Sequence, residues 1–119
     1  MIQHVAVEVR REQVDACVAF WALLAFERVE PPPTLRERAV WVEREHTQVH
    51  LMYADEPVVP PNAHVAVVVD DYERTFAALE EGGHAPEARR EHWGSPRCFV
   101  LDPAGHRVEV MATPPTSSP

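Results

Sequence analysis

Apolar and polar positions alternate at the start of the chain, and this pattern predicts a β-strand over residues 2–9. One face of this segment is aliphatic and consists of Val5, Val7 and Val9. Because successive side chains of a strand point to opposite faces, this face packs on a core and the other face is free for a different use. The apolar positions of residues 14–24 instead follow the 3.6-residue period of a helix that buries one face. Three consecutive prolines at 31–33 prevent its continuation, and residues 38–44 and 46–53 predict two more strands.

The second half of the chain repeats this order of elements. The predicted elements are strands over 64–69, 85–90, 97–101 and 106–112, with a helix after the first of them. Asp70 and Asp71 are candidate N-caps of that helix, because their side chains can accept hydrogen bonds from its first free backbone amides. Gly82 and Gly83 mark its end. Each half therefore predicts a βαβββ module.

Two short sequence matches indicate that the halves arose by duplication. His4-Val-Ala-Val recurs 60 positions later as His64-Val-Ala-Val, and Val49-His-Leu-Met has a partner 59 positions later in Val108-Glu-Val-Met. Two independent matches at nearly the same offset, in a chain of about twice that length, are typical of a tandem repeat. The predicted organisation is a first module at 1–54, a linker at 55–62, a second module at 63–112 and a disordered tail at 113–119, together forming one compact domain.

Four metal-ligand residue types occupy equivalent places in the two repeats. His4 and His64 lie opposite the aliphatic stripes of their strands, and His50 and Glu109 do the same on the last strand of each module. If the modules assemble around a pseudo-twofold axis, these four positions converge on one concave surface. Three imidazoles and a carboxylate suit a divalent metal such as Zn, Fe, Ni, Mn or Co. The alternative is a metal-free pocket in which the same side chains serve as hydrogen-bonding groups.

Composition narrows the possible partners. The 119 residues carry 11 basic and 19 acidic side chains, for a formal net charge of −8. Such a chain is a poor ligand for nucleic acid or an anionic membrane, because neutralised phosphates supply most of that affinity. It has no apolar run approaching the ~18 residues of a membrane span. Its two cysteines, Cys17 and Cys98, form no disulfide framework, which favours a reducing, cytoplasmic location. We therefore expect a small-molecule-binding or protein-binding domain.

The motifs of the chain resemble those of the vicinal oxygen chelate superfamily, which includes glyoxalase I, bleomycin-resistance proteins and extradiol dioxygenases. The similar segments are the openings of the two repeats, the helix end Phe20–Phe26 and the closing stretch Asp102–Val110. The resemblance implies an α+β fold in which two tandem βαβββ modules form a cup-shaped mixed sheet around a central pocket, usually in a homodimer. It also implies metal ligands at His4, His50, His64 and Glu109. The family usually has Leu-Gly-Phe where this chain has Leu24-Ala25-Phe26, which puts the local turn in doubt.

The resemblance implies several kinds of chemistry. The first hypothesis is a metal-dependent lyase or isomerase that stabilises an enediolate or oxyanion of a small oxygen-chelating substrate, with Glu109 or His50 as the base. An Fe(II) dioxygenase is a second possibility. A third is a metal-free drug-binding protein of the bleomycin-resistance type, with which Trp41, Trp93, Tyr53 and the acidic charge are compatible. A further alternative is a duplicated sheet domain that has lost its active site and is retained for protein–protein contact. Arg97 and Arg107 either hold an anionic substrate or are solvated.

Overall fold

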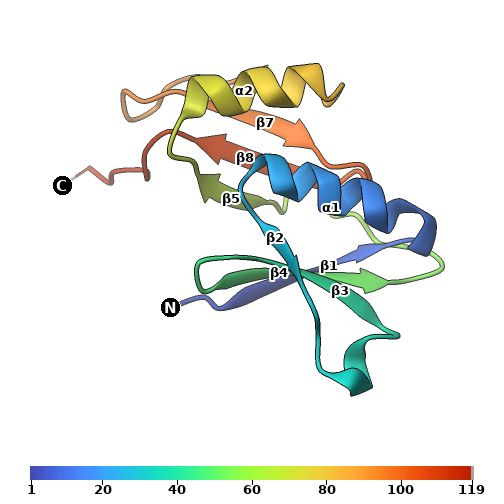
Figure 1. Cartoon of the computed structure of the whole chain (residues 1–119). Coiled ribbons are helices and arrows are strands. Elements are labelled where there is room, and N and C mark those ends of the chain that lie inside the picture. The colour runs from blue at the N-terminus through green and yellow to red at the C-terminus, as the bar shows by residue number, and fades with distance from the viewer. Residues whose placement is uncertain (119) are drawn as a thin grey trace.

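The computed structural model describes residues 1–118 and consists of two four-stranded sheets and two helices (Figure 1). The first module contains β1 (His4–Val9), α1 (Val14–Leu23), β2 (Glu27–Val29), β3 (Ala39–Arg44) and β4 (Thr47–Tyr53). The second contains β5 (Val65–Val68), α2 (Tyr72–Glu81), β6 (Glu87–Ala88), β7 (Arg97–Leu101) and β8 (Arg107–Met111). Short 3-10 turns cover Arg11–Gln13 and Pro33–Leu35. The predicted α+β pair of βαβββ modules is confirmed.

Both sheets have the same topology. Their strand orders are β1-β4-β3-β2 and β5-β8-β7-β6, with the first strand of each module parallel to the last. The register also repeats, because Ala6 lies opposite His50 in one sheet and Ala66 lies opposite Glu109 in the other. The repeat in sequence is therefore a repeat in structure, and it places His50 and Glu109 in equivalent positions.

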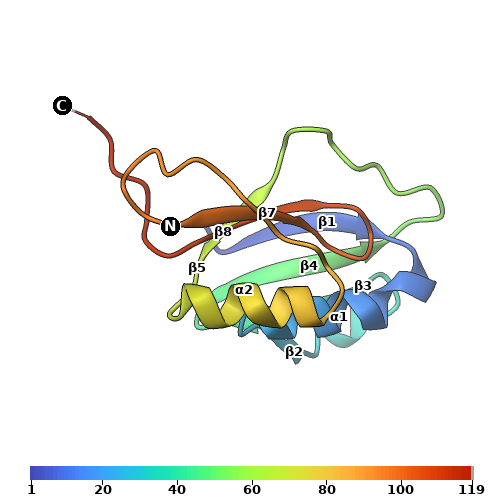
Figure 2. The ribbon, with the colours of Figure 1, turned by 90° about the horizontal axis from the view of Figure 1, so that it is seen from above.

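The two modules share one hydrophobic core. Figure 2 shows both helices on the same side of the sheets. The aliphatic stripes of β1, β4 and β8 pack there against Phe20 and Trp21 of α1 and Leu79 of α2. A contact near the sheet edges adds to this joint, since His106 Nε2 donates to the Glu8 carbonyl oxygen at 2.7 Å. The faces away from the helices are left for polar side chains.

The turn between β7 and β8 is built around a buried carboxylate. Asp102 Oδ1 accepts from the backbone amides of Ala104 and His106, both at 2.9 Å. Gly105 closes the turn with a φ of +90°, a conformation that glycine adopts without steric cost. Burial raises the pKa of Asp102, because the charged form loses hydration. This turn fixes where β8, and hence Glu109, begins.

The chain departs from the sequence predictions mainly in short elements. The strand that the βαβββ pattern required after α1 is only three residues long, and the prolines at 31–33 follow it in an irregular segment, as predicted. The strand expected near 85–90 is reduced to the two residues of β6. No helix within residues 1–118 is long and apolar enough to cross a bilayer. The predicted disordered tail ends at residue 119, which lies outside the described residues, and residues 113–118 contain no helix or strand.

The turn from α1 to β2 holds Ala25 in the left-handed region, with a φ of 68°. A side chain there costs about 1–2 kcal/mol that glycine does not pay. We expect Ala25→Gly to raise the free energy of unfolding by about 0.5–1 kcal/mol. Relief of the left-handed backbone accounts for the gain, and the greater conformational entropy of glycine in the unfolded chain reduces it. Urea unfolding measures this change. The control Ala22→Gly lies within α1 and should lower stability by a similar amount. A loss of stability in both variants would contradict the prediction.

Candidate functional site

The four predicted ligand residues all lie on the sheet faces turned away from the helices. His4 begins β1, His50 lies within β4, His64 directly precedes β5, and Glu109 lies within β8. Alternation along each strand produces this placement, because the neighbouring aliphatic side chains belong to the shared core. The structure groups the residues two by two, one pair in each module.

The pair in the first module is a stack of aromatic rings. The His4 and His50 rings are stacked with their centroids 4.0 Å apart. The ring of Trp41, a residue of β3, stacks on His50 as well, with a centroid distance of 4.1 Å and an interplanar angle of 4°. His50 is buried, and burial lowers its pKa, with a further lowering from the neighbouring charge of His4. Since an ordinary histidine has a pKa near 6.5, the His50 imidazole is neutral at neutral pH.

A short chain of hydrogen bonds orients the His50 ring. His50 Nε2 donates to Gln48 Oε1 at 2.8 Å, and Gln48 Nε2 in turn donates to Glu43 Oε1 at 2.8 Å. Because the Glu43 carboxylate can only accept when ionised, it fixes the orientation of the Gln48 amide. Gln48 therefore holds the proton of His50 on Nε2. The lone pair is left on Nδ1, where it is available for a proton or a metal.

The pair in the second module is an ion-pair network. His64 Nε2 lies 3.1 Å from Glu109 Oε1, and Arg97 Nη1 lies 3.1 Å from Glu109 Oε2. Glu109 is almost fully buried, so it needs these partners to offset the loss of hydration. His64 Nδ1 donates to the Asn62 carbonyl at 2.8 Å. Both ring nitrogens of His64 are therefore engaged, one by the Asn62 carbonyl and the other by Glu109.

The geometry of the second pair fits a metal ion, and that of the first does not as it stands. Two ligand atoms about 2.1 Å from one ion lie about 3.0–3.4 Å apart, and the hydrogen-bonded His64 Nε2 and Glu109 Oε1, 3.1 Å apart, can keep this separation when an ion takes the place of the proton between them. The stacked rings of His4 and His50 are inclined by only 13°, so their in-plane lone pairs do not converge. Within residues 1–118, no three His, Cys, Asp or Glu side chains gather closely enough to hold a metal. The chain thus offers two half-sites at equivalent positions of the repeat, and only the second has the spacing of two ligands on one ion.

Cavities adjoin both half-sites. One of about 460 Å³ is lined by the stacked rings of the first module and by Arg38. Another of about 350 Å³ lies between β1 and the second module, where His64 and Trp21 contribute to the wall. Both cavities are large enough for a small molecule. Space is therefore available beside His4 and His50 in the first module and beside His64 in the second.

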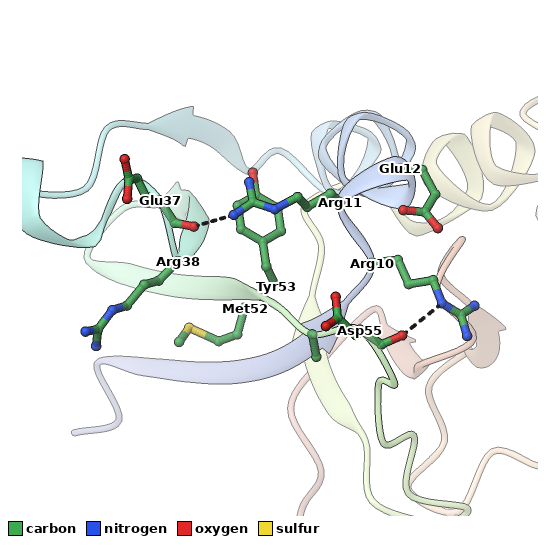
Figure 3. Close-up of a pocket in the computed structure, with 9 residues that line it drawn as sticks. Arg10, Arg11, Glu12, Glu37, Arg38, Met52, Tyr53 and Asp55 are labelled. Atoms are coloured by element: carbon green, nitrogen blue, oxygen red, sulfur yellow. Dashed lines mark hydrogen bonds between the residues drawn. The ribbon is translucent and has the colours of Figure 1, made fainter.

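A third cavity, of about 500 Å³, lies at the end of the first sheet (Figure 3). Two of its three arginines, Arg10 and Arg11, are held by neighbouring groups. Arg11 Nη2 donates to the Glu37 carbonyl at 2.7 Å and lies over the Tyr53 ring, and Arg10 reaches the Asp55 carbonyl. None of the predicted ligand residues lines it. Despite its size, this cavity is separate from the candidate chemistry.

Comparison with known proteins identifies the family. A family model described as a glyoxalase-like domain matches residues 5–111. The chain belongs to the glyoxalase-like domain family. The resemblance to the vicinal oxygen chelate superfamily is thereby confirmed. A comparison with curated proteins gives no match.

Solved structures of glyoxalase-like proteins share the fold. A glyoxalase/dioxygenase from Nostoc punctiforme superposes with a TM-score of 0.76 at 18% identity, covering 97% of this chain and 92% of its own. A lactoylglutathione lyase from Agrobacterium tumefaciens gives 0.70 at 22% identity, covering 93% and 92%. At these identities the likeness extends to the fold alone.

Several site features were missed in the sequence. The sequence indicates a drug-binding or packing role for Trp41 and does not predict its stacking on His50. The sequence analysis does not single out Phe99, which lies opposite Glu109, or Arg89, which lies over the Phe99 ring. Phe99 follows Arg97 by two positions on the same strand, so the two side chains point to the same face. This alternation is the sequence feature that could have identified Phe99 as a site residue.

Proposed function

We propose that this glyoxalase-like protein is a metal-dependent enzyme of lyase or isomerase type acting on a small oxygen-chelating substrate. The spacing of His64 and Glu109, which matches that of two ligands on one ion, carries the proposal. The equivalent pair in the first module, His4 and His50, supplies the remaining donors. The metal would be divalent and of the transition series, because imidazole and carboxylate are its preferred ligands.

The chain's own residues would have two roles, to bind the metal and to transfer a proton. When bound, a divalent metal supplies Lewis acidity to neighbouring substrate oxygens. His50 is neutral and presents only Nδ1, so it can accept a proton from a substrate carbon when that nitrogen does not hold the metal. Gln48 and Glu43 keep that ring in the required tautomer, and Trp41 fixes its plane. Glu109 is the other candidate base once it is released from Arg97.

We further propose that two copies of the chain assemble in the cytoplasm and join complementary half-sites. β1 and β5 are edge strands of their sheets, so each has backbone groups available to another strand. A symmetric dimer presents the first module of one chain to the second module of its partner. Such pairing would combine His4 and His50 of one copy with His64 and Glu109 of the other.

A second candidate function is metal-free binding of a cationic aromatic drug. Two observations favour it: Trp41 already stacks on His50, and Arg97 already neutralises Glu109. In this reading the ring stack is a platform for a flat ligand. The acidic surplus of the chain would then attract the cationic partner.

Metal content distinguishes the two candidates. Untagged protein should retain about one equivalent of metal per assembled site after dialysis, measured by elemental analysis. His64→Ala and Glu109→Ala should each weaken metal binding by at least about tenfold, because each removes one ligand. The matched control His92→Ala removes an exposed loop imidazole and should leave metal content unchanged. Wild-type protein that binds no metal on reconstitution, yet binds a cationic aromatic drug at micromolar concentration, would support the second candidate instead.

A further inference from the structure

Three arginines surround one aromatic ring of the second module, on the sheet face opposite the core. The guanidinium carbons lie 5.5 Å from the Phe99 ring centroid for Arg89, 5.5 Å for Arg97 and 5.1 Å for Arg107. Contact with the ring face attracts each cation and limits the orientations of its side chain. We name these four residues the arginine cluster.

The arginine cluster carries one more positive charge than its neighbours neutralise. Arg89 is paired with Glu87 at 3.1 Å, and Arg97 with Glu109 at 3.1 Å. Among residues 1–118, Arg107 has neither a hydrogen-bond nor an ion-pair partner for its side chain. Its donors are therefore available to a ligand. In a chain of net charge −8, this local surplus of positive charge stands out.

The arginine cluster adjoins the His64–Glu109 pair. The pairing of β7 with β8 sets Phe99 opposite Glu109 and Leu101 opposite Arg107, so these side chains share a face. The His64 ring meets the Phe99 ring edge-on, with centroids 5.2 Å apart. A cavity of about 370 Å³ is lined by Phe99, Arg89 and Arg107. A molecule in this cavity would contact the free guanidinium.

One member of the arginine cluster is held firmly in place. Arg97 Nε donates to the Arg90 carbonyl at 2.9 Å, and its side chain is only 11% exposed. Arg107 rests on the ring and is half-buried, so it loses little freedom when it binds. Like charges brought this close repel one another, and a bound anion relieves that repulsion.

We propose that the arginine cluster binds an oxyanion, the carboxylate or phosphate group of an anionic small molecule, with Arg107 as its main donor. The planar guanidinium fork matches both groups and pairs with them through two parallel hydrogen bonds. As a statement about the substrate, this inference rests on the proposed function, and it assigns the substrate to the anionic class. Binding of the oxyanion itself needs no metal and can be measured separately.

The test uses the full chain treated with a chelator, at low ionic strength. Inorganic phosphate and, separately, acetate are titrated while NMR follows the arginine Nε–H and Phe99 ring resonances. The wild type should show saturable shifts at the arginine cluster. Arg107→Gln should weaken binding about tenfold through loss of a charge-assisted hydrogen bond, and Arg89→Gln, at a more exposed position, should weaken it severalfold. The matched control Arg28→Gln, on the other sheet, should bind like the wild type.

The outcomes separate this proposal from the metal centre. Equal phosphate and acetate affinities in the wild type and Arg107→Gln, or no saturable shift in the wild type, would overturn it. A stronger response to phosphate or to acetate assigns the oxyanion. Normal anion binding in a protein that never takes up metal would leave this inference standing while removing the proposed enzyme. Far-ultraviolet circular dichroism confirms that each variant is folded.

Discussion

Truncation of Trp21 to alanine is expected to lower the free energy of unfolding by about 3–5 kcal/mol, the largest stability loss that a single core substitution should produce here. Trp21 is 1% exposed and makes edge-on contacts with Phe20 and Phe26 at centroid distances of 5.6 and 5.1 Å. It also lines the cavity between β1 and the second module. Its removal would leave a void next to both sheets. Both modules should therefore lose stability together.

Equilibrium unfolding in urea, followed by circular dichroism, measures this loss. Trp41 and Trp93 remain as fluorescent reporters in the first and second modules, respectively. Their combined fluorescence and the circular dichroism should give the same single midpoint, because one core serves both modules. Leu101→Ala, at a position 55% exposed, is the control and should change stability by less than about 0.5 kcal/mol. Two separate midpoints for Trp21→Ala would show that the modules fold independently.

The fold was predictable because two periodicities and one repeat all indicated the same arrangement. Alternation in residues 2–9 assigned Val5 and Val7 to the packed face, and the structure places both against the core. The His-Val-Ala-Val repeat predicted equivalent modules, and the equivalent registers of Ala6 and Ala66 confirm it. Parity along a strand depends only on local geometry, so sequence suffices for it.

The arrangement of the site was less accessible, because it depends on distances between strands. Parity placed His4 and His50 on one face but could not predict that their rings stack and that Trp41 covers them. Likewise, it could not predict that Arg97 takes one oxygen of Glu109. The three residues of β2 are too few for an alternation to be recognised. Binding of one metal by His4, His50, His64 and Glu109 together stays a prediction. Because these residues lie in two separate half-sites, the prediction requires that two copies of the chain assemble.

Replacement of Arg97 by leucine is expected to destabilise the protein by about 3–5 kcal/mol, because it removes the guanidinium from the buried Glu109 carboxylate and leaves His64 as its one remaining side-chain partner among the described residues. The two side chains are only 11% and 10% exposed, so solvent screens them weakly. In the double variant Arg97→Leu/Glu109→Leu no unpaired charge remains, and most of the loss should be recovered. Urea unfolding of the four proteins in a double-mutant cycle gives the coupling free energy. Additive effects of the two single substitutions would contradict a strong pair.

The same substitution separates the two candidate functions, since Arg97 and a metal would compete for the same carboxylate. If Glu109 is a ligand, Arg97→Leu removes that competitor, and affinity for a divalent transition metal should rise about tenfold, equivalent to about 1.4 kcal/mol. Arg28→Leu removes a charge of the same sign from β2 in the other module and should leave the affinity unchanged. If the pocket instead works without metal, Arg97→Leu should bind metal no better than the wild type. Arg97→Leu would therefore lower stability and raise metal affinity together only if Glu109 serves as a metal ligand.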